Sequence, residues 1–200
     1  MSRIQCDRCQ RPQSRCLCPL IPALDSRTRV VLLQHPDEVR HALNTARLAA
    51  LGLCNGELRV GEVFDGLEAL IATPGYRPGL LFPGEQAQPL RAYGEDPDPR
   101  PWMLIVPDGT WRKARKLLYL NPLLEALPRV TLAGVQPSRY RLRKAPEAGA
   151  LSTIEAVTQA LNVLEGEGRF DQLLRPFDAL IEGQIEAMGR DTFERNHLRG

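Results

Sequence analysis

Short apolar runs alternate with amphipathic segments along most of the chain. The run 29-RVVLLQ-34 is apolar and β-branched, which is typical of a strand buried on both faces. Similar runs predict further strands at 57–63, 79–83, 102–107 and 129–134. Helical spacing of the apolar positions predicts helices between them, at 37–53, 65–72, 110–119, 122–127, 152–165 and 169–189.

This alternation predicts βαβ units, and therefore an α/β fold with a mainly parallel sheet flanked by helices. Ligands of such sheets bind beyond the carboxyl ends of the strands, where Asp108, His35 and 81-LFP-83 fall. A lone histidine is more often structural, so His35 is a secondary candidate. The polar, proline-rich loop 84–100 is long for a compact domain, and such loops are usually functional or disordered.

The bulk properties set the class of protein. A 200-residue chain can bury a substantial core without disulfides. No apolar run approaches the ~20 residues of a membrane span, and 1-MSRIQCDRCQ-10 lacks the apolar core of a secretory signal. We therefore expect a cytoplasmic protein with one main domain, 29–200, preceded by a cysteine-rich segment, 1–28.

Positive charge is concentrated in one part of the chain. The net charge is only +2, but residues 108–144 carry nine Lys/Arg against two Asp/Glu. The stretch 138-SRYRLRK-144 also places an aromatic ring among its cations, which is typical of RNA binding. The alternative is a solvated, solubilising face. The predicted RNA contacts are Arg112, Lys113, Arg115, Lys116, Arg139, Tyr140, Arg141, Arg143 and Lys144.

Four cysteines lie within thirteen residues, as Cys6-x-x-Cys9 and Cys16-x-Cys18. Two close-spaced pairs can form the two halves of a tetrahedral four-thiolate zinc site, so we expect structural zinc on Cys6, Cys9, Cys16 and Cys18. The single spacer residue in the second pair departs from the usual pattern. The alternative is reduced thiols, or a redox pair, in a loose segment. Cys54 stands alone, and we expect it to be a small buried hydrophobe.

The stretch 107-PDGTWRKARKLL-118 joins an apolar run to a basic helix. Asp108 or Thr110 could cap that helix. Capping leaves Trp111 unexplained, whereas a tryptophan at the mouth of a site can stack on a base. An aspartate at a strand end can accept a proton, and Gly109 lets backbone approach a ligand. These residues therefore favour a site.

A second motif, 151-LSTIEAVTQAL-161, has the pattern of a capping box, with Ser152 as N-cap and Glu155 three residues on. A helix N-terminus can also present its amides to a carboxylate. The two interpretations can both hold.

These segments together resemble the DTW-domain family. Asp108-x-Thr110-Trp111 matches the signature that names it. The cysteine-rich start, 34-QHPDEVRHALNTARL-48, 81-LFP-83, 138-SRYRLRK-144 and 151-LSTIEA-156 are similar to the family's other blocks, in the same order. The resemblance covers nearly the whole chain, and the ordered set is far more specific than the tetrapeptide alone.

The resemblance implies a reaction and a fold. DTW-domain proteins are similar to enzymes that transfer the 3-amino-3-carboxypropyl group of S-adenosylmethionine to N3 of a tRNA uridine, in the variable loop for bacterial members, leaving 5′-methylthioadenosine. The family is related to SPOUT methyltransferases, so a C-terminal knot is expected. The implied cofactor pocket comprises the loops 81–84, 107–111 and 149–155, with Leu81, Phe82, Pro83, Asp108, Gly109, Leu151, Ser152, Thr153 and Glu155.

Within that reaction we assign Asp108, Thr110 and Trp111 to catalysis, with Asp108 as the base for uridine N3 and Trp111 stacking on the target base. Two alternatives stay open. A SPOUT-type RNA methyltransferase would use the same pocket with the methyl carbon presented instead. A non-catalytic, zinc-containing RNA-binding module would explain the cysteines and basic loops but neither Asp108 nor Trp111.

Overall fold

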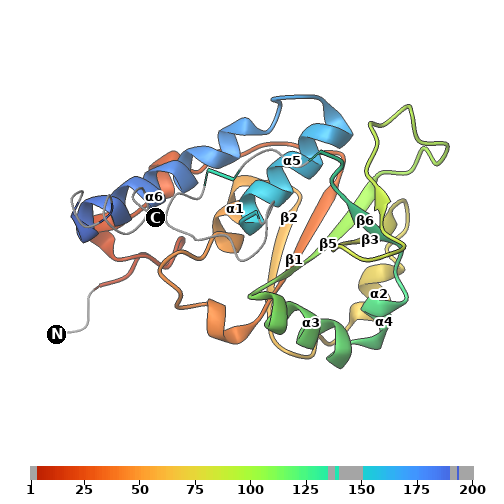
Figure 1. The fold of residues 1–200 in the computed structure, drawn as a ribbon, viewed down its shortest axis with the longest axis horizontal. Coiled ribbons are helices and arrows are strands. Elements are labelled where there is room, and N and C mark those ends of the chain that lie inside the picture. The colour runs from red at the N-terminus through yellow and green to blue at the C-terminus, as the bar shows by residue number, and fades with distance from the viewer. Residues whose placement is uncertain (1–3, 135–137, 140–150, 190–192, 194–200) are drawn as a thin grey trace.

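The computed structural model describes residues 4–134, 138–139, 151–189 and 193, and its centre is a parallel sheet (Figure 1). The five predicted strands form, and a short sixth one joins them at an edge. All neighbours pair in parallel, in the order β2-β1-β5-β3-β6-β4. The strands are β1 Arg29–Gln34, β2 Gly56–Val60, β3 Arg77–Leu81, β4 Gln88–Pro89, β5 Trp102–Asp108 and β6 Arg129–Thr131.

The predicted helices occur, with one exception described below. Within the described residues, none of them is long and apolar enough to cross a bilayer. The predicted helix 169–189 begins as a 3-10 turn and continues as α6. The helices are α1 Ala46–Gly52, α2 Leu67–Ile71, α3 Trp111–Leu120, α4 Pro122–Glu125, α5 Thr153–Glu165 and α6 Arg175–Met188, with 3-10 turns η1 Gln13–Arg15, η2 Cys18–Leu20, η3 Pro36–Glu38 and η4 Asp171–Leu174.

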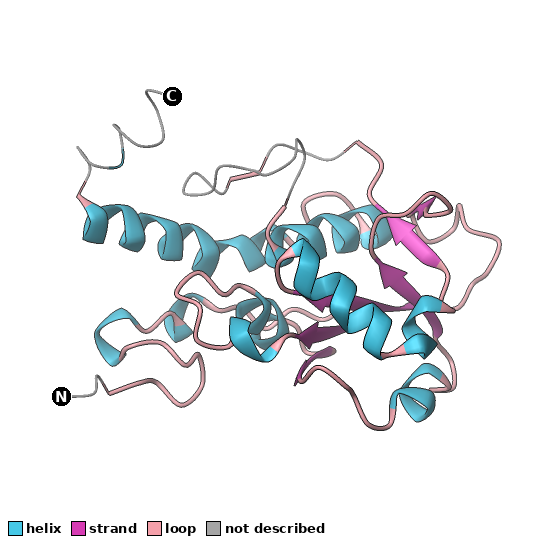
Figure 2. Ribbon diagram, turned by 60° about the horizontal axis from the view of Figure 1, so that its bottom comes forward, coloured by secondary structure: helices cyan, strands magenta, loops and turns pink. Residues whose placement is uncertain are grey.

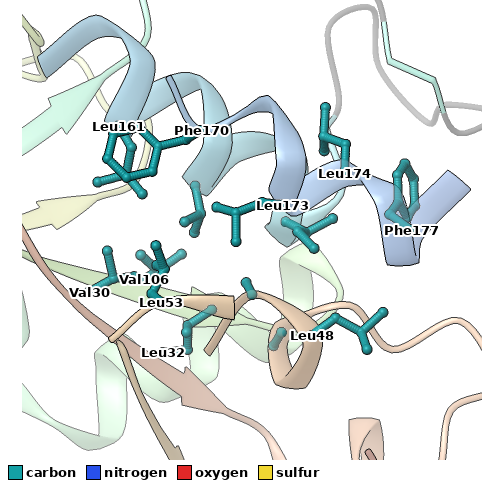
Figure 3. Packing of buried hydrophobic residues seen from close by; sticks show 14 of the residues in the cluster. Val30, Leu32, Leu48, Leu53, Val106, Leu161, Phe170, Leu173, Leu174 and Phe177 are labelled. Atoms are coloured by element: carbon teal, nitrogen blue, oxygen red, sulfur yellow. The ribbon is translucent and has the colours of Figure 1, made fainter. Parts of the chain in front are cut away.

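Helices cover both faces of the sheet. Successive side chains of a strand point to opposite faces, so the apolar residues of one strand pack against both helix layers. Val30 and Leu32 pack with α1, α5 and α6, above the sheet in Figure 1 and in close-up in Figure 3. Val31 and Leu33 pack with α2, α3 and α4, the layer that Figure 2 brings forward. The result is a three-layer α/β/α sandwich, as the fold-class prediction required.

The predicted helix 37–53 is wrong over its first half. Its start is a 3-10 turn, and regular helix begins only at Ala46. The guanidinium of Arg11 donates to the carbonyl oxygens of Ala42 (2.8 Å) and Asn44 (2.7 Å), which a continuous helix would use internally. The Asn44 side chain also donates to Glu38 O (2.8 Å). Contacts from a distant segment therefore override the local helical pattern.

The loop 84–100 has structural partners along its length. It contains β4, which pairs with β6 at the edge of the sheet. The Tyr93 hydroxyl accepts a hydrogen bond from Trp102 N (2.8 Å), and Asp96 pairs with Arg77 (2.7 Å). The second half of the loop therefore lies at the amino ends of β3 and β5, and β4 extends the edge of the sheet beside β6.

The cysteine-rich segment packs into the main core. Cys9, Leu17 and Ile21 belong to the same hydrophobic cluster as α5 and α6. Arg15 donates to Gly183 O in α6 (2.7 Å). The predicted C-terminal knot depends on the path of 140–150, which lies outside the described residues.

Candidate functional site

Asp108 lies at the carboxyl end of β5, directly beside Gln34 at the end of β1. Register between two parallel strands brings these polar residues together, although 74 positions separate them in sequence. Asp108 is 7% exposed and Gln34 is fully buried. A buried carboxylate at this edge of the sheet is costly unless it has partners, so its contacts define the site.

Two neutral groups hold the Asp108 carboxylate. Gln34 Nε2 donates to Oδ2 (2.8 Å), and the Thr153 hydroxyl donates to Oδ1 through a short hydrogen bond. Burial raises the pKa of Asp108, and these two hydrogen bonds offset only part of that rise. The nearby Glu38 also raises the pKa. The result is a carboxylate whose proton affinity is higher than that of an exposed aspartate, as a general base requires.

The residues after Asp108 start helix α3. Thr110 is the N-cap of α3, and its side chain accepts from Lys113 N (3.4 Å). Asp108 does not cap this helix. At Gly109 an added Cβ would lie 3.0 Å from Lys113 Cβ, so a larger residue would be crowded there. The capping interpretation thus holds for Thr110, while Asp108 belongs to the site.

Trp111 is half-buried and packs edge-on against Phe82, with ring centroids 5.6 Å apart and an interplanar angle of 64°. Phe82 follows β3, so the predicted segments 81–83 and 107–111 lie side by side. Arg129 lies near the Phe82 ring, 5.8 Å from its centroid, and donates to Pro83 O (3.3 Å). Thr153 brings the third predicted segment to Asp108.

The start of α5 has the predicted capping box. Ser152 Oγ accepts from the Glu155 backbone N–H, and Glu155 Oε2 accepts from Ser152 N (2.9 Å) and also from Ser152 Oγ (2.6 Å). Glu155 also accepts from Ser138 Oγ (2.9 Å) and Arg139 N (2.6 Å). The carboxylate therefore joins the basic segment at 138–139 to the helix start. Tyr140, Arg141, Arg143 and Lys144 lie outside the described residues.

The contacts of His35, Lys113 and Lys116 with acidic residues after β1 and β2 escaped the sequence prediction. His35 is 4% exposed, and its Nε2 lies 2.8 Å from Glu62 Oε1. Lys116 pairs with the same oxygen (2.7 Å), and this contact lowers the pKa of Glu62. Lys113 pairs with Glu38 (2.8 Å), which raises the pKa of the lysine. Two of the four cations of α3 are thus engaged within the protein.

A cavity of about 510 Å³ lies between the end of β6, α5 and the turn before η4. Of the predicted site residues, Arg139 and Glu155 line it. Apart from Thr158 and Gln159, which lie in the stretch 151–161, no motif in the sequence pointed to the rest of its lining. They are Leu132, Ala133, Gly134, Thr158, Gln159, Asn162, Val163, Glu167, Gly168, Asp171 and Leu174.

The four N-terminal cysteines meet in space, and their sulfur atoms all lie within 4.8 Å of one another. Sγ of Cys6 lies 3.6 Å from that of Cys18, and Sγ of Cys9 lies 3.8 Å from that of Cys16. A cluster with these spacings can hold a metal ion. Cys54, in contrast, is exposed, so the prediction that it is buried is wrong. It lies in the turn after α1, where the chain leaves the core.

The thiols of this cluster do not ionise alike. Backbone N–H groups of Cys9 and Arg8 lower the pKa of Cys6 to about 6. Burial and the neighbouring thiols raise the pKa of Cys18 to about 12. Each thiolate makes ionisation of the neighbouring thiols less favourable, because like charges repel. Four thiolates at these separations therefore need a cation between them.

This chain is similar to proteins of one family. The DTW domain profile matches residues 3–185. The tRNA-uridine aminocarboxypropyltransferase 2 of Macaca fascicularis is 33% identical over 98% of this chain and 68% of its own length. The Drosophila melanogaster protein of the same name is 34% identical over 92% of this chain and 76% of its own length. The tRNA-uridine aminocarboxypropyltransferase A of Arabidopsis thaliana is 31% identical over 82% of this chain and 73% of its own length. No solved structure gave a significant match.

Proposed function

Because the chain belongs to the DTW-domain family, we propose that it is a tRNA-uridine aminocarboxypropyltransferase. It transfers the 3-amino-3-carboxypropyl group of S-adenosylmethionine to N3 of a tRNA uridine, at the variable-loop position, and releases 5′-methylthioadenosine. The observation that carries this proposal is the buried Asp108 carboxylate at the strand ends, inside the region that the DTW domain profile matches.

Asp108 is the base for this reaction. Uridine N3 carries a proton at neutral pH, and the raised pKa of Asp108 suits it to accept that proton. N3 then forms a bond to the γ-carbon of the donor, while the bond from that carbon to sulfur breaks and leaves its electron pair on sulfur. Proton removal of this kind contributes about 10²–10⁴-fold to the rate.

The three segments around Asp108 bind the donor in this proposal. Leu81, Phe82 and Pro83 follow β3, Gly109 follows β5, and Leu151, Ser152 and Thr153 precede or open α5. Their meeting around one carboxylate supports this assignment, since ligands of parallel sheets bind at the carboxyl ends of strands. Trp111 stacks on the target base, and its packing against Phe82 would orient the ring. We further propose that the domain is SPOUT-like, as the family resemblance implies.

Cys6, Cys9, Cys16 and Cys18 hold a structural zinc ion. A tetrahedral site with Zn–S bonds of about 2.3 Å requires sulfur atoms roughly 3.8 Å apart. The separations of 3.6 and 3.8 Å fit that requirement, and all the sulfur atoms lie within 4.8 Å of one another. Four thiolates leave no open position for a substrate, so this ion supports the fold and takes no part in the transfer. Reduced thiols of this kind fit a cytoplasmic location.

The test is direct. Purified protein is incubated with S-adenosylmethionine and unmodified bacterial tRNA, and the digested nucleosides are weighed. We expect a uridine that gains the aminocarboxypropyl group. A uridine that gains only a methyl group would instead identify a methyltransferase. Unchanged nucleosides with salt-dependent tRNA binding would identify a binding module.

A further inference from the structure

The outer face of α3 differs from the rest of the basic region, because its cations are divided between two roles. Lys113 and Lys116 pair with acidic residues of the protein, namely Asp37, Glu38 and Glu62. Arg112 and Arg115 are exposed, and in the described part of the chain neither forms an ion pair. The helix therefore presents two uncompensated guanidinium groups to solvent.

Tyr119 completes this face. It is 81% exposed, which is unusual for a tyrosine on a helix whose other side is packed. Residues three and four apart lie on the same side of a helix, so Arg112, Arg115 and Tyr119 form one stripe, with Lys116 beside it. Ala114, Leu117 and Leu118 on the opposite side are buried in the core. The core thus fixes the direction in which the stripe points.

The stripe begins next to the proposed site. Trp111, the first residue of α3, comes three positions after Asp108 and precedes Arg112 directly. The helix has ten residues and is therefore about 15 Å long. A polyanion whose reacting base reached Asp108 would have its neighbouring nucleotides within reach of the stripe.

From this arrangement we propose that Arg112, Arg115 and Tyr119 form the surface that receives the substrate RNA beside the target uridine. Arg112 and Arg115 bind backbone phosphates, and Tyr119 stacks on an unpaired base. Lys113 and Lys116 instead hold the loops after β1 and β2 against α3. This assignment rests on the proposed function, and it separates cations that the sequence pattern treated as equivalent.

Salt-dependent tRNA binding tests the arginines. The dissociation constant is measured from low to moderate salt for the unaltered protein, for Arg112→Ala with Arg115→Ala, and for a control with Arg91→Ala and Arg175→Ala. Both double variants remove two exposed cations, and the control pair lies on loop 84–100 and at the start of α6. We expect the magnitude of the slope of the logarithm of the dissociation constant against the logarithm of the salt concentration to fall by about two, in the first variant only.

The role of Tyr119 is tested with two substitutions, one that removes the ring and one that keeps it. Tyr119→Ala should weaken tRNA binding roughly five- to a hundredfold, since stacking of one base is lost, and Tyr119→Phe should retain binding. Equal slopes in both arginine variants, together with unaltered binding by Tyr119→Ala, would overturn the proposed surface.

The two proposals fail separately. The same preparations are assayed for transfer of the aminocarboxypropyl group. If the unaltered protein transfers the group while the α3 variants bind tRNA normally, the surface is wrong and the function stands. If the unaltered protein transfers no group, and the α3 variants bind tRNA more weakly than it does, the RNA surface is right and the reaction is wrong.

Discussion

Thr153 donates a hydrogen bond through its hydroxyl to Asp108, and this contact joins the start of α5 to the end of β5. Gln34 at the end of β1 holds the other carboxylate oxygen (2.8 Å). Within the described residues, no cation pairs with Asp108. A buried carboxylate with only neutral donors keeps a raised pKa, and this property makes it suited to take a proton from uridine N3.

Asp108→Asn should lower the transfer rate by about 10²–10⁴-fold, because an amide cannot act as the base. The fold should survive. Gln34 Oε1 has no hydrogen-bond partner, so the Gln34 amide can turn and accept a hydrogen bond from the amide introduced at position 108. Single-turnover transfer and thermal unfolding are measured on the same preparation. Full activity in a folded variant would remove Asp108 from the role of base.

The same substitution predicts a pH dependence of stability. The folded-state pKa of Asp108 lies above the value of about 3.9 for an unfolded aspartate. Between these two values the folded protein binds more protons, so rising pH lowers the stability of the unaltered protein. The melting temperature of Asp108→Asn, relative to the unaltered protein, should therefore be higher at pH 7 than at pH 4. A difference that is constant with pH would contradict the raised pKa.

Thr153→Val tests the hydrogen bond between Thr153 and Asp108. The Thr153 hydroxyl lowers the pKa of Asp108, so its removal should raise that pKa further. Transfer needs the unprotonated carboxylate, and the acidic limb of the kcat/KM profile should move to higher pH. Thr153→Ser keeps the hydroxyl and should keep the limb in place. A uniform loss of rate without movement of the limb would assign Thr153 a structural role only.

Cys9→Ser should abolish stoichiometric zinc and lower the melting temperature. Cys9 is 4% exposed and packs in the main core, so the metal site and the core are continuous. For a chain of this size, each kcal/mol of lost stability lowers the melting temperature by about 2–4 °C. Metal content and melting are compared with Cys54→Ser, whose thiol is exposed and lies outside the cluster. Unchanged zinc in Cys9→Ser would exclude the four-cysteine site.

The strands and the helix cap at Ser152 followed from local pattern. Apolar runs predicted all five longer strands, and the capping box at Ser152 formed as predicted. Helix 37–53 did not follow, because Arg11 takes carbonyl groups that the local pattern assigns to the helix. No short window of sequence contains both partners of that contact.

The partners of the site residues were also beyond local pattern. Gln34 meets Asp108 only through the register of β1 and β5. Glu38 and Glu62 meet α3 only because the loops after β1 and β2 end at the same edge of the sheet. Charge composition therefore located the basic helix, while the division of its cations between structure and surface required the fold.

The most direct test of the proposed reaction is the identity of the adenosine product. Purified protein is turned over with S-adenosylmethionine, with and without tRNA, and the nucleoside by-product is identified by mass. We expect 5′-methylthioadenosine, formed only when tRNA is present and lost in Asp108→Asn. S-adenosylhomocysteine in its place would show that the methyl group is transferred, and would contradict aminocarboxypropyl transfer.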